Sequence, residues 1–275
     1  MDAQADAIVA DGWDNYIGDV DHRLANYAEF LVEFLKKKNS RHIYMDAACG
    51  TGIDSIMLLE NGFKVTSVDS SDNMVKLTLK KRWKRREERA FNEWVIQKAD
   101  WLTLPQKLAK PDKGFDAIIC IGNSITYLLD MGDIQLAIQN FHYMLKPGGW
   151  LIIDHRNYGA ILVSGCWPKT NIYFNGKIFN DNTVENTSKL IIRDVCVGVS
   201  SDKETDLSNY TKENGTSHKK KFRFINFPLQ LKDFTRDLKE VFGKGSKYEV
   251  YGDYKPLESF ENPAFFIHFI QKNEL

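Results

Sequence analysis

The stretch Tyr44-Met-Asp-Ala-Ala-Cys-Gly-Thr-Gly-Ile-Asp-Ser-Ile-Met57 decides the fold of this chain, because an apolar strand runs here into a glycine-rich loop and then into a helix. Gly50 and Gly52 permit positive φ angles and leave the backbone bare, so a ligand can approach main-chain N–H groups at the helix start. A dinucleotide-binding loop needs a third small residue, which Ser55 supplies only in part. The stretch predicts a binding loop for one end of a nucleotide.

Outward from this loop, strand and helix patterns alternate along the chain. Expected strands cover residues 42–47, 64–69, 94–99, 115–121, 150–154, 247–251 and 264–270. Expected helices cover residues 24–38, 54–61, 72–85, 133–145 and 231–242. Alternation of this kind predicts an α/β fold with a doubly wound, seven-stranded mixed sheet whose last strand is reversed, and ligands that bind beyond the carboxyl ends of the strands.

Residues 159–229 follow a different pattern. Short strand-like segments such as 189–199 and 222–227 are separated by turns rich in Asn, Gly and Lys. We expect an inserted antiparallel β cap over residues 159–229, and a core made of residues 1–158 and 230–275.

Asp69 closes the second expected strand, 17 positions past Gly52. That spacing suits a carboxylate that accepts both hydroxyls of an adenosine ribose. The alternative is that Asp69 caps the next helix, beside Ser71 and Asp72. Because strand, glycines, helix, strand and acid occur together, we favour the ribose.

The third expected strand ends at Asp100-Trp101. An acid and an aromatic ring at this edge suit an adenine site, with Asp100 accepting the exocyclic amine and Trp101 covering the ring. A helix cap and a core indole are the alternative.

Composition limits the classes of function. The chain has 275 residues, 43% of them hydrophobic, and a net charge of +0, which argues against a dedicated nucleic-acid binder. No apolar run has the length of a signal peptide or membrane span, so we expect a cytoplasmic protein. Four cysteines lie far apart, without the spacing of metal ligands or of paired thiols: Cys49, Cys120, Cys166 and Cys196.

The basic run at residues 80–86 leaves open a function directed at nucleic acid. Such a run most often forms a solvated helix face, but it also suits an enzyme that acts on nucleic acid.

Asp46 ahead of the glycines resembles the first motif of class I S-adenosylmethionine-dependent methyltransferases, whose fold is Rossmann-like. Nearly the whole chain resembles the glycine and glycine/sarcosine N-methyltransferases within that class. The matching segments are Trp13-Asp-Asn-Tyr-Ile-Gly-Asp19 with Arg23, Ala47-Ala-Cys-Gly-Thr-Gly-Ile-Asp-Ser-Ile-Met57, Val65-Thr-Ser-Val-Asp69, Ala99-Asp-Trp-Leu-Thr-Leu104, Gly122-Asn-Ser124 and Ile153-Asp-His-Arg-Asn-Tyr158.

The resemblance implies N-methylation of glycine to sarcosine, with S-adenosylmethionine as donor and S-adenosylhomocysteine as product. It implies a small amino acid as substrate, no metal, and a homo-oligomer as a possible assembly. It places Arg23 on the methionine carboxylate, within a cofactor pocket that comprises Trp13, Tyr16, Arg23, Ala48, Gly50, Asp69, Asp100, Trp101 and Ile121.

On the substrate side the resemblance implies Tyr16, Asn123, Arg156 and Tyr210. The planar guanidinium of Arg156 can hold a carboxylate by two parallel hydrogen bonds, which Lys cannot reproduce. The alternative for Arg156 is a structural ion pair with Asp154 or another acid.

The chain departs from the vertebrate members of this family where they carry tyrosines around the substrate. It has Gln4, Phe174, Asn226 and Phe265 at these places, and Asp100 where Asn is expected. The choice among glycine, sarcosine and dimethylglycine, and hence the number of methyl groups added, stays open.

Overall fold

The structure is a computed structural model. It describes residues 10, 13–14, 17, 20–38, 43–166, 170–171, 176–177, 181–199, 218–259 and 262–274.

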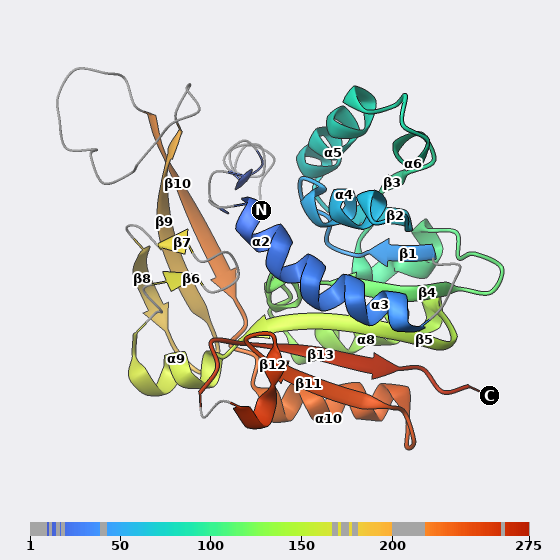
Figure 1. The fold of residues 1–275 in the computed structure, drawn as a ribbon. Helices are drawn as coiled ribbons and strands as arrows, with labels where there is room; N and C mark the ends of the chain where they lie inside the picture. The colour runs from blue at the N-terminus through green and yellow to red at the C-terminus, as the bar shows by residue number, and fades with distance from the viewer. Residues whose placement is uncertain are drawn as a thin grey trace.

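The main sheet confirms the expected doubly wound fold (Figure 1). Its strand order is β12-β11-β13-β5-β4-β1-β2-β3. Five strands are parallel: β1 (Ile43–Asp46), β2 (Lys64–Asp69), β3 (Val95–Lys98), β4 (Phe115–Cys120) and β5 (Leu145–Arg156).

The other edge of the sheet contains the reversed strand. β13 (Phe265–Gln271) lies antiparallel to both β5 and β11 (Tyr248–Gly252). The two-residue β12 (Lys255–Pro256) adds an eighth strand beyond the expected seven, because a tight turn at Asp253 and Tyr254 folds the chain back on β11.

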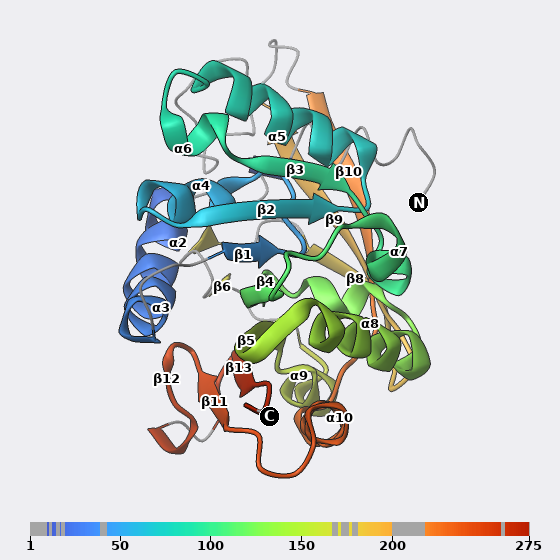
Figure 2. The ribbon, with the colours of Figure 1, turned by 90° about the vertical axis from the view of Figure 1, so that its right-hand side faces the viewer.

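Helices cover both faces of the sheet (Figure 2). One face carries α2 (Val20–Tyr27), the π-helical η1 (Ala28–Val32), α3 (Glu33–Lys38) and α4 (Ile53–Glu60). The opposite face carries α7 (Leu104–Lys107), α8 (Met131–Met144) and α10 (Leu231–Phe242). α5 (Asp72–Lys84) and α6 (Arg89–Asn92) lie beside the β3 edge.

The two layers of core explain the apolar run of β4. Ala117 and Ile119 pack under the first group of helices, whereas Ile118 and Cys120 pack under the second. Side chains alternate between the two faces of a strand, so a central strand covered on both sides must be apolar throughout.

β5 differs from the expected strand because it begins at Leu145 and includes the segment 146–149, which lies between the expected helix 133–145 and the expected strand 150–154. The register explains this: Phe115 pairs with Leu145, but Ala117 pairs with Trp150. The Pro-Gly-Gly segment is therefore accommodated as a bulge within the strand, as is typical where extra residues enter a ladder.

The segment between β5 and α10 contains the expected antiparallel strands. α9 (Tyr158–Ser164) is followed by the pair β6 (Thr170–Asn171) and β7 (Gly176–Lys177), and then by a sheet of β8 (Asp181–Asn186), β9 (Ile191–Val199) and β10 (His218–Asn226). Figure 1 shows β1 pointing toward the side on which β8, β9 and β10 stand. Phe227 N donates to Thr126 O at 2.8 Å and so joins the end of β10 to the loop after β4.

Candidate functional site

The loop after β1 is held by the acid at the end of β2. Asp69 Oδ2 accepts the main-chain N–H of Gly50 at 2.9 Å, and Oδ1 accepts that of Ser71 at 2.9 Å. The φ angle of Gly50 is +51° and that of Gly52 is +83°, both in the left-handed region. The sequence thus located the loop correctly. The main-chain N–H of Gly50, a group that we expected a ligand to approach, instead donates to Asp69 within the protein.

The N-terminal segment lies against the same loop. A Cβ atom at Gly50 would come within 3.5 Å of Trp13 Nε1, so the indole lies close to the loop backbone. Thr51 Oγ1 donates to Asp14 Oδ1 at 2.5 Å, and Lys81 pairs with Asp14 Oδ2 at 3.0 Å. These contacts place Trp13, one of the predicted cofactor residues, beside Gly50.

Asp46 begins a series of buried, hydrogen-bonded side chains beneath the loop. Ser55 Oγ donates to Asp46 Oδ2 at 2.5 Å and lies 2.6 Å from Ser67 Oγ, which accepts Trp94 Nε1–H at 2.7 Å. Asp46 Oδ1 is buried and has no hydrogen-bond partner of normal geometry among the described residues. Burial, reinforced by the nearby Asp54 carboxylate, raises the pKa of Asp46 to about 7.

Arg23 lies in a buried ion pair. Its two terminal nitrogens donate to the two oxygens of Asp54, and the hydrogen bond from Nη2 to Oδ2 is 2.8 Å long. Its guanidinium lies 4.8 Å from the centre of the Tyr27 ring. Burial acts to lower the pKa of Arg23, but the Asp54 carboxylate outweighs it and the pKa is raised. Arg23 is thus fixed as a cation beside the loop, and its Nη2 atom would lie 3.8 Å from a Cβ atom at Gly122.

Asp100 and Trp101 follow β3 at the same edge. Asp100 is exposed, and its Oδ1 accepts Leu102 N–H at 2.8 Å as the cap of the short helix η2 (Trp101–Thr103). The half-buried Trp101 donates its indole N–H to Ala47 O at 2.5 Å, which orients the ring beside Ala48. The helix cap that we gave as the alternative role of Asp100 is therefore present. It uses only Oδ1, so Oδ2 is not needed for the cap.

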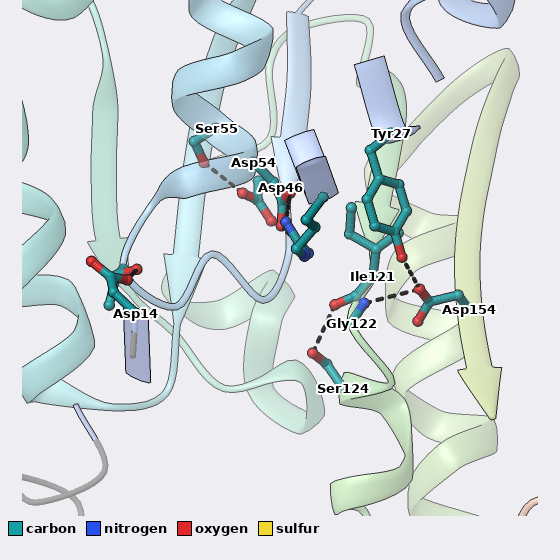
Figure 3. Close-up of polar contacts among 11 residues, drawn as sticks. Asp14, Tyr27, Asp46, Asp54, Ser55, Ile121, Gly122, Ser124 and Asp154 are labelled. Atoms are coloured by element: carbon teal, nitrogen blue, oxygen red, sulfur yellow. Dashed lines mark hydrogen bonds and ion pairs between the residues drawn. The ribbon is translucent and has the colours of Figure 1, made fainter. Parts of the chain in front are cut away.

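Asp154 clamps the turn after β4 (Figure 3). It accepts hydrogen bonds from Tyr27 Oη at 2.7 Å, Gly122 N at 3.0 Å and Asn123 N at 2.6 Å. Burial raises the pKa of Asp154 to about 6, although these donors act in the opposite direction. The clamp fixes the backbone between the buried Ile121 and Asn123, whose φ of 66° is left-handed.

Arg156 ends β5 and is only 4% exposed. Two positions earlier on the same strand, Asp154 receives its hydrogen bonds from Tyr27, Gly122 and Asn123. Asn123 holds Arg156 in place: its Oδ1 accepts the Arg156 main-chain N–H at 2.9 Å and its Nδ2 donates to Tyr158 Oη at 2.8 Å.

Sequence reasoning missed several residues that organise this edge. Tyr27 and Asp54 lie on helices whose apolar patterns gave no reason to single out one polar group. Asp154, by contrast, ends the strand expected at 150–154, on the ligand-binding edge, a position that could have identified it. Tyr158 and Thr126 had no such signal, because only the fold brings them together.

Four residues considered from the sequence lie outside the described part of the chain. Two are predicted site residues, Tyr16 and Tyr210. The other two are Gln4 and Phe174.

The basic run lies on α5 and just after it, and much of its charge is paired. Arg85 binds Glu60 and Glu88, and Lys81 binds Asp14. In the described residues we find no group of three or more His, Cys, Asp or Glu side chains placed to hold a metal ion. Nor does any helix in that part of the chain have the length and apolarity to cross a membrane.

Comparison with known proteins identifies the family. Residues 45–149 match a family described as a methyltransferase domain. A rat protein named glycine N-methyltransferase is 42% identical over 98% of this chain and 93% of its own length. A glycine/sarcosine N-methyltransferase of Halorhodospira halochloris is 32% identical over 95% of this chain and 86% of its own length.

Among solved structures, an S-adenosylmethionine-dependent methyltransferase from Clostridium acetobutylicum ATCC 824 has the same fold. It covers 90% of this chain and 92% of its own, with a TM-score of 0.66 at 18% identity. The relatives, which match almost from end to end, settle the family more narrowly than the fold does: the chain belongs to the glycine N-methyltransferase family.

Proposed function

We propose that this protein transfers a methyl group from S-adenosylmethionine to the amine of glycine, giving sarcosine, and then to sarcosine, giving dimethylglycine. The observation that carries the proposal is the position of Arg156, a buried arginine at the carboxyl end of β5 whose main-chain N–H is held by the Asn123 side chain. A small amino acid offers the carboxylate that such a guanidinium binds in a bidentate manner.

The residues around the loop fit S-adenosylmethionine. Asp69 lies against the loop backbone, Trp101 presents an oriented ring, and Asp46 Oδ1 is a buried acceptor without a partner of normal geometry in the described chain. Acidic oxygens suit a ligand with a cationic amino-acid end and a ribose. In this assignment Ile121, Ala48, Trp13 and Arg23 complete the pocket.

When bound, S-adenosylmethionine supplies a sulfonium methyl group that a neutral amine takes by direct displacement. The part of the protein is chiefly positioning, which can contribute about 7–11 kcal/mol. Arg156 holds the carboxylate, Asn123 and Asp154 hold the backbone around it, and Tyr16 and Tyr210 orient the amine. The substrate amine loses its proton to solvent before transfer.

In this proposal residues 1–158 and 230–275 form the cofactor-binding core, and residues 159–229 form the substrate cap. The separate antiparallel sheet of β8, β9 and β10 supports the division. The hydrogen bond from Phe227 to Thr126 joins the end of β10 to the segment that begins with Asn123.

Steady-state assays with glycine, sarcosine and dimethylglycine, with products identified by mass spectrometry, test the proposal. Arg156→Lys should lower kcat/KM for glycine by about 10- to 100-fold, because a point charge cannot make two parallel bonds. Arg236→Lys, on the exposed face of α10, is the matched control. Wild-type efficiency in Arg156→Lys would exclude this role, and methyl transfer to bulk RNA but not to glycine would favour the nucleic-acid alternative.

A further inference from the structure

Thr126 is the hub of a buried hydrogen-bond network between the loop after β4 and the end of β10. Its Oγ1 donates to Asn123 O at 2.8 Å, lies 3.3 Å from Tyr158 Oη, and accepts from Asn226 Nδ2 at 3.0 Å. A hydroxyl has one hydrogen, and a carbonyl oxygen can only accept. The Thr126 hydrogen is therefore committed to Asn123 O, and both Tyr158 and Asn226 must donate to Thr126.

This direction of donation fixes the amide of Asn226. Only its nitrogen can face Thr126, so Oδ1 must point away from the network. Asn226 is 0% exposed, and Oδ1 has no hydrogen-bond partner among the described residues. Buried acceptors without a donor are rare in folded proteins, and each requires an explanation.

The network connects this acceptor to Arg156. Asn123, which receives the Thr126 hydrogen bond at its carbonyl, accepts the Arg156 main-chain N–H through its side chain. Asn226 closes β10 in the antiparallel sheet, opposite Ile191, whereas most of the residues assigned to the cofactor precede β1 or follow β1, β2 and β3. The donor missing from Oδ1 thus belongs on the substrate side.

We propose that Asn226 Oδ1 accepts an N–H of the substrate amine and thereby restricts methylation to amines that carry one. The inference rests on the proposed function. Neutral glycine has two N–H groups and neutral sarcosine has one, so both can donate while the lone pair stays free to attack. Neutral dimethylglycine has no N–H group and leaves Asn226 Oδ1 without a donor, so the reaction stops at dimethylglycine.

Asn226→Leu tests this, because it keeps the approximate side-chain volume and removes the acceptor. We expect kcat/KM for glycine and sarcosine to fall about tenfold. Inhibition by acetate, which has the carboxylate but no amine, should not change. Tyr158→Phe is the matched control: it removes a hydroxyl that supports Asn123 and hence Arg156, so glycine efficiency and acetate inhibition should weaken together. If Asn226→Leu does not fold, the wild-type protein still tests the proposal, because it should methylate sarcosine and not dimethylglycine.

Two results would overturn the proposal. One is weakening of acetate inhibition in Asn226→Leu by the same factor as glycine efficiency, since Asn226 would then only support the structure. The other is wild-type methylation of dimethylglycine as efficient as that of sarcosine. A wild-type protein that binds S-adenosylmethionine but methylates none of the amines would instead refute the proposed function.

Discussion

The carboxylate of Asp69 accepts the main-chain N–H of Gly50 at 2.9 Å and so locks the loop after β1 to the end of β2. Its other oxygen accepts the N–H of Ser71. One acid at the strand end thus shapes both turns at this edge.

Asp69→Asn should disrupt this arrangement. An amide offers one oxygen where two are used, so one N–H group loses its acceptor, at a cost of about 1–3 kcal/mol in the free energy of unfolding. We expect S-adenosylmethionine binding, measured by calorimetry, to weaken at least about tenfold. Asp72→Asn, three positions on and paired with Lys98 at the surface, is the control and should bind normally. Unchanged binding in Asp69→Asn would contradict the assigned role.

Gly52 and Gly62 form a natural comparison, because both have positive φ, at 83° and 86°. A Cβ at Gly52 would lie 2.8 Å from Thr78 Cγ2, whereas one at Gly62 meets no atom within 4 Å. Gly62→Ala should cost about 1–2 kcal/mol from the backbone alone. Gly52→Ala should cost roughly 2–5 kcal/mol, since a clash is added. Urea unfolding measures both, and equal losses would show that packing around Gly52 is unimportant.

Tyr27→Phe removes the hydroxyl that reaches Asp154 from α2. The buried carboxyl keeps only its two backbone donors, so the free energy of unfolding should drop by about 1–3 kcal/mol. Because the same carboxyl holds the turn at Gly122 and Asn123, kcat/KM for glycine should drop as well. Tyr251→Phe, whose hydroxyl bonds Glu249 at 2.6 Å, is the control. A Tyr27→Phe protein as stable and active as the control would argue against the clamp.

His155 makes stability depend on pH. It stacks on His268 with 5.0 Å between ring centres, and burial lowers its pKa to about 4. A histidine with a lowered pKa contributes stability that is complete above the unfolded value, about 6.5, and is lost as pH falls toward 4. The raised pKa of Asp154 has the opposite sign, because its contribution declines as pH rises from about 4 to about 6.

Replacement of His155 separates these two effects. In His155→Phe the slope of unfolding free energy against pH, between pH 4 and 6.5, should decrease by up to about 1.4 kcal/mol per pH unit. Chemical unfolding at several pH values measures this slope. His142→Phe, at a half-buried position on α8, is the comparison. An unchanged slope in His155→Phe would mean that His155 takes up its proton without cost to the fold.

Local sequence patterns predicted the core of this protein well. The strand at 64–69 and the helix at 231–242 were both predicted with the observed limits, because alternation and helical periodicity are properties of neighbouring residues. The Lys-Pro-Gly-Gly segment at 146–149 was expected to lie outside the strand, after the helix 133–145. Its inclusion in β5 depends on pairing with β4, which local composition does not encode.

The candidate site was predicted in outline and not in its internal bonds. Topology placed Asp69 and Arg156 at one edge, since parallel strands end there together. The sequence could not show that Arg23 pairs with Asp54, because 31 positions separate them and only the docking of α2 on α4 brings them together. Nor could it show that an amide oxygen of Asn226 is left without a donor.

The position of β13 between β5 and β11 has a consequence for biosynthesis. The ribosome completes β5 more than a hundred residues before it makes β13. Until then the nascent chain exposes an apolar strand with unpaired backbone groups, the kind of edge that other chains can join. This edge is therefore the place where shielding, by a chaperone or by temporary contacts within the growing polypeptide, should raise the yield of folded protein.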